Sequence, residues 1–204
     1  MYFVIQYYWP DDRSEPFVKA IEPLGVPGMS KFAGKPFPAS FPEMRIIIYQ
    51  LGQMPDICIQ NCHLCMTPDC ISRLQEVGET HFETWPVRIV AQTGGEDAES
   101  LRIVNLLDNV SCMDMEKSQF KLDRSPPHDI LKIRRLVLDE SRIPADRHLF
   151  RMAEFETVFL ISEPLRDLFV ADGLPAFLFQ PSHEFDTEMP YDPERWALEG
   201  KKPE

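Results

Sequence analysis

Two stretches of this chain follow the same pattern, and this repetition constrains the fold more than any other feature. In each stretch, apolar residues run into a serine, a short helical pattern follows, and a strand-like run ends the unit. The first stretch spans residues 70–90 with its serine at Ser72, and the second spans residues 160–179 with its serine at Ser162. Because a short helix packs readily between two strands, we expect two similar strand–helix–strand units.

Both serines are expected to cap their helices rather than to act as nucleophiles. A serine hydroxyl can accept a hydrogen bond from an unpaired N–H group in the first helical turn. Ser72 and Gln75 have the spacing of a capping box, and Pro164 is tolerated in the first turn after Ser162. Gly173 is placed to end the second helix. Neither serine lies in a GxSxG motif, so capping is the favoured interpretation.

Other strand-like runs are interleaved irregularly with these units. They lie at residues 2–8, 46–49, 101–107, 130–138, 150–152 and 158–161, and are rich in β-branched and other apolar residues. A buried helix turn is the alternative for residues 46–49. Residues 22–43 contain five prolines and three glycines, which predicts an extended, irregular segment. This irregular order favours an α+β fold, with a mixed or antiparallel sheet and short helices, over a regular doubly wound sheet.

The length of the chain suits one compact domain. With 204 residues, of which 44% are hydrophobic, the chain can bury a substantial core. We expect a single globular domain over residues 1–182, with lobes at 1–95 and 96–182 as an open alternative. Residues 183–204 are acidic and contain proline, so we expect a surface arm held by Phe185, Tyr191 and Trp196.

The charge balance argues against two classes of partner. The formal net charge is −12, which disfavours nucleic acid and anionic membrane surfaces and favours a basic partner. No segment approaches the roughly 18 apolar residues that a membrane helix needs. The first residues lack the features of a secretory signal, so we expect a cytoplasmic protein with reduced cysteines.

Four of the five cysteines lie close together in the sequence CIQNCHLCMTPDC, residues 58–70. Cys62, His63, Cys65 and Cys70 could form a zinc site, so a small zinc-containing module or metal-dependent enzyme built on Cys58–Cys70 is one alternative. Structural zinc sites usually combine two ligand knuckles, whereas only one CxxC motif is present. Thiols also pack as small apolar groups. We therefore favour core or surface thiols and expect no cofactor.

The remaining polar residues do not form a recognisable catalytic set. His81, His128, His148 and His183 are scattered, and each is expected to be a surface or hydrogen-bonded histidine. The HEFDTE sequence that begins at His183 lacks the second histidine of a zinc protease. We therefore expect no catalytic residues and a protein that is not an enzyme.

The C-terminal half contains a series of short motifs. They are NLLDNV at 105–110, CMD at 112–114, EKS at 116–118, LVLDE at 136–140, IP at 143–144, HLFR at 148–151, and an IS-capped helix that ends near DGL at 172–174. In order and spacing these resemble family eleven of the immunity proteins of bacterial polymorphic toxin systems. The ISRL sequence at 71–74, with residues 82–90, resembles an earlier element of that family. The resemblance covers roughly residues 70–180, and Pro175-Ala176 replaces the family's usual threonine–glycine pair.

The resemblance implies a non-catalytic toxin inhibitor used in bacterial competition. Its partner would be the C-terminal domain of a cognate toxin, which it would block by occlusion. We assign the motif residues Asn105, Ser118, Phe150, Arg151 and Ser162 to the fold. Glu184, Asp186, Glu188 and Asp192 are candidates for an acidic rim that faces the toxin, with a solvated tail as the alternative.

A third class of function also fits the acidic composition. An adaptor or chaperone for a secreted effector would share the lack of catalysis, but it would leave its partner active. The sequence leaves the oligomeric state and the toxin's activity open.

Overall fold

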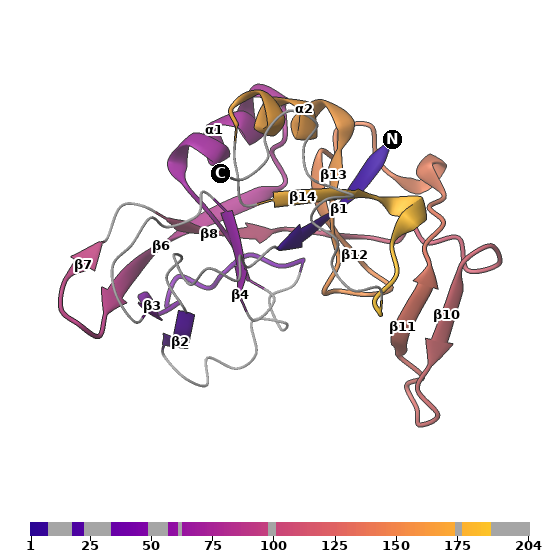
Figure 1. The fold of residues 1–204 in the computed structure, drawn as a ribbon, viewed down its shortest axis with the longest axis horizontal. Helices are drawn as coiled ribbons and strands as arrows, with labels where there is room; N and C mark the ends of the chain where they lie inside the picture. Colours follow the sequence, from indigo (N-terminus) through magenta and orange to yellow (C-terminus); the bar gives the residue numbers. More distant parts are fainter. Residues whose placement is uncertain are drawn as a thin grey trace.

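In a computed structural model, the described residues are 1–7, 18–22, 34–48, 57–60, 63–97, 101–173 and 177–188. They form an α+β fold, as the irregular order of elements predicts. Two sheets meet beneath a pair of short helices, and a separate hairpin projects from one end (Figure 1).

The larger sheet contains the first strand–helix–strand unit. Its neighbouring strands run in the order β2 (Val18–Glu22), β3 (Met44–Ile48), β6 (Phe82–Ala91), β8 (Arg102–Leu106), β5 (His63–Met66) and β4 (Ile57–Gln60), and β7 (Glu96–Asp97) pairs with β6. Strand β6 changes neighbours along its length: residues 82–86 pair with β8, and residues 87–91 pair with β3. Pro86 ends the first ladder, where a missing N–H group is tolerated.

The second sheet contains the second unit together with the first strand of the chain. Its strands run in the order β14 (Phe177–Pro181), β1 (Tyr2–Tyr7), β13 (Phe159–Ser162), β12 (Leu149–Met152) and β9 (Asn109–Val110). Strand β1 is antiparallel to both β13 and β14, whereas β9 and β12 run parallel.

The two predicted strand–helix–strand units are confirmed, and they share one topology. Helix α1 (Pro68–Glu76) joins β5 to β6, and β8 lies between those two strands. Helix α2 (Glu163–Ala171) joins β13 to β14, and β1 lies between them. In both units the middle strand is antiparallel to its neighbours, so the two outer strands are parallel to each other. The helix therefore crosses over a strand that comes from another part of the chain. This is a split βαβ arrangement.

The predicted capping box at Ser72 is wrong. Helix α1 begins one turn earlier, at Pro68, and its N-cap is Thr67, whose hydroxyl accepts a hydrogen bond from the helix backbone. Ser72 lies inside the helix and donates to the Asp69 carbonyl at 2.6 Å. Threonine followed by proline and an acidic residue is itself a helix-start signal, and it outweighs the later serine.

Ser162 occupies the N-cap position of α2 but does not cap it through its side chain. Its hydroxyl instead lies 2.8 Å from Nδ1 of His148. Gly173 ends the helix as predicted: its φ is 70°, a backbone conformation that glycine adopts without strain, and its N–H donates to the Val170 carbonyl.

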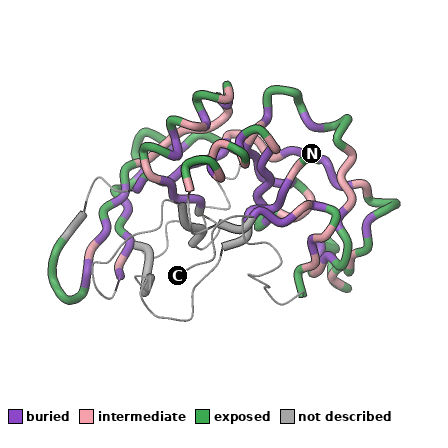
Figure 2. Tube along the Cα trace, turned by 45° about the horizontal axis from the view of Figure 1, so that its top comes forward, coloured by how far each residue is buried: buried purple, intermediate pink, exposed green. Residues whose placement is uncertain are grey.

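One apolar cluster joins the two units. Helices α1 and α2 lie side by side over it, and Arg73 on α1 forms a 2.8 Å ion pair with Asp172 at the end of α2 (Figure 1). Buried stretches are concentrated in the strands beneath the helices (Figure 2). Members with almost no exposed surface come from both sheets and both helices: Leu64, Leu74, Leu106, Phe159, Leu165 and Phe169.

The described part of the proline-rich segment is irregular, as predicted, and packs on the larger sheet. The Phe37 and Phe41 rings stack with centroids 4.0 Å apart, and both contact Trp85 edge-on. Asn105 on β8 donates to the Lys35 carbonyl at 2.8 Å. The apolar rings and this buried amide together hold the segment in place.

Candidate functional site

The cysteine-rich stretch places two described thiols in different parts of the core. Cys65 on β5 is buried in the cluster that contains Ile46 and Ile89, whereas Cys70 on α1 is buried in the cluster between the two units. Successive residues of a strand point to opposite faces of its sheet, which is why Leu64 but not Cys65 shares a cluster with Cys70. The two thiols therefore cannot ligate one ion.

The other two candidate zinc ligands, Cys62 and the side chain of His63, lie outside the described part of the structure. Within the described part of the chain, no group of three or more His, Cys, Asp or Glu side chains could hold a metal ion. Cys65 and Cys70 are core thiols, one of the two placements that the sequence left open.

Cys112 is also buried, and its thiol is expected to be unreactive in the folded protein. Burial raises the pKa of the Cys112 thiol to about 12, and the carboxylate of Glu154 adds to the shift. At pH 8 we expect iodoacetamide to modify Cys112 on the order of 100-fold more slowly in the native protein than in the unfolded chain. Peptide mass spectrometry after timed labelling would measure both rates, and equal rates would contradict the buried placement.

A buried carboxylate ties the first unit to the second sheet. Glu79 lies just after α1 and is almost fully buried. Its Oε1 accepts from the His81 N–H at 2.8 Å, and its Oε2 accepts from the N–H groups of His148 and Leu149 at 2.7 and 3.1 Å. Because all three donors are backbone groups, this arrangement fixes the start of β12 against the end of α1.

Arg147 extends the same polar network toward the surface. Its guanidinium donates to Asp108 at 2.7 Å and pairs with Asp146 at 2.9 Å. Burial lowers the pKa of Arg147, but the hydrogen bond and charge of Asp108, with the charges of Asp146 and Glu79, outweigh burial and raise it. Nη1 of Arg147 lies 2.6 Å from Nδ1 of His81, and because a guanidinium only donates, that nitrogen accepts the hydrogen bond.

The Ser162–His148 contact is the nearest approach to a nucleophile and base pair in this region. Ser162 is buried, and its hydroxyl faces the His148 ring. The nearby carboxylate of Glu79 binds the backbone N–H of His148 and does not orient its ring. The polar network around Glu79 and Ser162 therefore links the two sheets, in agreement with the assignment of Ser162 to the fold.

Three of the four residues of the predicted acidic rim lie within the described part of the chain. Glu184, Asp186 and Glu188 are described, and Asp192 lies outside the described residues. Asp186 accepts a hydrogen bond from the Glu188 N–H at 2.8 Å, and Phe185 is buried. Phe185 therefore lies in the core, whereas Thr187 and Glu188 are exposed.

Glu188 binds the hairpin formed by β10 (Gln119–Leu122) and β11 (Ile130–Arg135). Its carboxylate forms ion pairs with Lys132 and Arg134 on β11. The neighbouring Thr187 donates its N–H to the Ile133 carbonyl at 2.8 Å and accepts from the Ile133 N–H through its hydroxyl. The segment therefore follows the outer edge of β11 and offsets part of the hairpin's charge.

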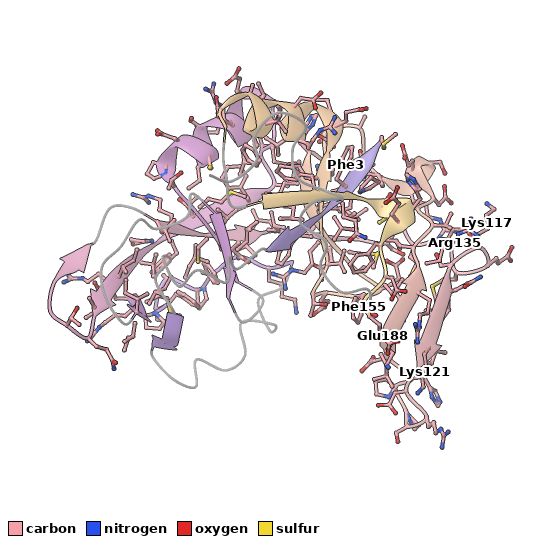
Figure 3. All side chains as sticks on the ribbon, viewed as in Figure 1. Phe3, Lys117, Lys121, Arg135, Phe155 and Glu188 are labelled. Atoms are coloured by element: carbon pink, nitrogen blue, oxygen red, sulfur yellow. The ribbon has the colours of Figure 1, made fainter. Side chains whose placement is uncertain are left out.

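The hairpin itself is a basic surface on an acidic protein. Residues 117–135 contain six Lys or Arg and two Asp, a net charge of +4, in a chain whose net charge is −12. Figure 3 shows Lys117 and Arg135 at the base of the hairpin and Lys121 nearer its tip. The net charge of the whole chain conceals this surface, whereas the charge within residues 117–135 alone reveals it.

Neither a scan against protein-family models nor a search of curated proteins finds a match to this chain. Within the described ranges, neither α1 nor α2 has the length and apolar character needed to cross a bilayer.

Proposed function

We propose that this protein is an immunity protein of a bacterial polymorphic toxin system. It binds the C-terminal domain of a cognate toxin in the cytoplasm and neutralises it by covering the toxin's functional surface. It performs no catalysis of its own. The proposal starts from the ordered motifs over roughly residues 70–180 that resemble immunity family eleven.

The observation that best supports this proposal is that the motif residues hold the scaffold together. Asn105, Ser118, Phe150, Arg151 and Ser162 are all buried. Ser118, for example, accepts from the Val137 N–H at 2.9 Å and donates to the Val137 carbonyl at 3.2 Å. The guanidinium of Arg151 lies over the Phe159 ring at 4.8 Å. Buried motifs define a shared fold and leave the surface free to vary with the partner, as inhibitors of different toxins require.

Inhibition by occlusion needs a surface that can bury enough area. A stable protein–protein interface buries about 1,600 Å² in total, and a few anchor residues contribute most of its energy. The hairpin β10–β11 projects from the fold and combines charged with apolar side chains (Figure 3). Such a projection can enter a concave site on a partner.

Co-expression with the toxin domain encoded by the neighbouring gene tests the proposal. We expect cells to survive the toxin only when this protein is present, and the purified proteins to form a complex in which toxin activity falls to zero at equimolar inhibitor. A complex with an active toxin would indicate an adaptor instead. Absence of both rescue and binding would refute the proposed function.

Metal analysis of the purified protein tests the zinc alternative. We expect far less than stoichiometric zinc, and an unfolding midpoint that EDTA does not change, because the described thiols Cys65 and Cys70 lie in separate core clusters. Stoichiometric zinc together with chelator-induced unfolding would favour the zinc-containing module.

A further inference from the structure

We propose that the β10–β11 hairpin is the docking surface of this protein and that its partner presents an acidic protein surface with apolar side chains. Under the proposed function, on which this inference rests, that surface belongs to the toxin domain. The inference reverses the charge relation expected from the chain as a whole, in which acidic residues would face a basic toxin.

The hairpin keeps several cations available for a partner. Lys117 is engaged by Asp114 at 2.7 Å, and Lys132 and Arg134 are engaged by Glu188. The other three basic residues of the hairpin form no ion pair with any described residue: Lys121, Arg124 and Arg135. All three are exposed. A cation that lacks an intramolecular partner can pair with a carboxylate across an interface without first breaking an existing contact.

Exposed apolar side chains accompany these cations. Met115, Leu122 and Leu131 expose 44%, 43% and 47% of their surface, and Met1 is the one other large apolar side chain with comparable exposure among the described residues. Three of these four side chains therefore lie in the hairpin or directly before it. Apolar groups gathered beside charged ones on a projecting element are typical of interaction surfaces.

The backbone of β10 also has an open side. Ile133 uses its N–H and carbonyl groups to bind Thr187, so it does not exchange them with its cross-strand partner Phe120. In an antiparallel pair this places the N–H and carbonyl groups of Phe120 on the side away from β11. No described strand pairs with that side of β10. A partner can therefore add backbone hydrogen bonds to the side-chain contacts.

Two other classes of partner fit the charges of the hairpin and of the whole chain less well. A second copy of the chain also carries a net charge of −12, so two copies repel each other as they approach. Nucleic acid is repelled by the same overall charge, and Asp123 and Asp129 flank the tip of the hairpin. An acidic patch on an otherwise basic or neutral protein avoids both problems.

A charge-reversal pair of variants tests the inference. The test variant is Lys121→Glu/Arg124→Glu/Arg135→Glu, and the control is Lys35→Glu/Arg45→Glu/Arg102→Glu, which changes the net charge equally at exposed positions elsewhere. We expect the test variant to bind the toxin domain at least about tenfold more weakly, mainly through slower association at low salt. The control should stay within about twofold of the wild type. Equal thermal midpoints would show that both variants fold.

Glu188→Gln separates the hairpin from the acidic rim, because the two ideas predict opposite results. Removal of this carboxylate releases Lys132 and Arg134. If the hairpin meets an acidic surface, the variant should associate faster with the toxin domain, by about twofold or more at low salt. Slower association would place Glu188 against a basic toxin surface and overturn the inference.

The remaining outcomes are also decisive. If the wild type binds the toxin domain and the hairpin variant binds equally well, the inference is wrong while the proposed function stands. If the wild type neither binds nor protects, the proposed function is wrong and the inference falls with it. Binding of a random single-stranded RNA oligonucleotide at physiological salt, lost in the hairpin variant but not in the control, would assign the hairpin to nucleic acid and also overturn the inference.

Discussion

Replacement of Phe150 by alanine is expected to lower the free energy of unfolding by about 3–5 kcal/mol. Phe150 lies on β12, and its side chain has no exposed surface. Its ring contacts Tyr2 edge-on, with centroids 5.5 Å apart. Truncation removes the apolar contacts of the ring and leaves a cavity that the surrounding strands cannot close fully.

Urea denaturation followed by circular dichroism would measure this loss. Leu131→Ala provides the control, because Leu131 is about half exposed and its truncation should change stability by less than about 0.5 kcal/mol. Phe150 shares its cluster with Ile133 on β11 and with Phe185. The Phe150 variant should therefore also loosen the base of the hairpin. A loss of only a few tenths of a kcal/mol would show that the ring is not in the core.

Replacement of Glu79 by alanine is expected to lower the free energy of unfolding by about 3 kcal/mol or more, because three backbone N–H groups, one in a buried and two in partly buried contacts, would lose their acceptor together. These groups belong to His81, His148 and Leu149. The guanidinium of Arg147 would also lose the nearby charge of Glu79, which supports its protonated form. The two sheets should therefore separate more easily at this joint.

Glu76→Ala is the matched control for this change. Glu76 is the last residue of α1, three positions before Glu79, but its side chain is half exposed and its contact is an ion pair with Arg73. Its removal should cost less than about 1 kcal/mol. Hydrogen exchange would add a local reading: the His148 and Leu149 amides should lose protection in the Glu79 variant and keep it in the control. Similar free energies of unfolding for the two variants would contradict a stabilising role for the Glu79 carboxylate.

The two strand–helix–strand units could be predicted because their signal is local. A run of apolar residues, a turn of helical spacing and a second apolar run reflect what neighbouring residues must bury. The strand predicted at residues 130–138 became β11 (Ile130–Arg135) for the same reason. The error at Ser72 was also local, since two helix-start signals compete within six residues and the chain uses the one at Thr67.

The candidate site could not be predicted, because it depends on contacts between distant residues. Glu188 meets Lys132 across 56 positions, and Glu79 meets Leu149 across 70. No periodicity within a short window encodes such pairs. The sequence made Glu188 a candidate for an acidic rim, and only the fold shows that its carboxylate pairs with two cations of the hairpin.

The sequence by itself determined the α+β class and the two related units, because these follow from the local placement of apolar residues. Tertiary structure alone decided which charges are satisfied within the molecule. It paired Glu188 with Lys132 and Arg134 and left Lys121, Arg124 and Arg135 exposed on a projecting hairpin. The physical reason is that apolar patterning acts over one turn or one strand, whereas the pairing of charges is set by whichever surfaces the folded chain brings together.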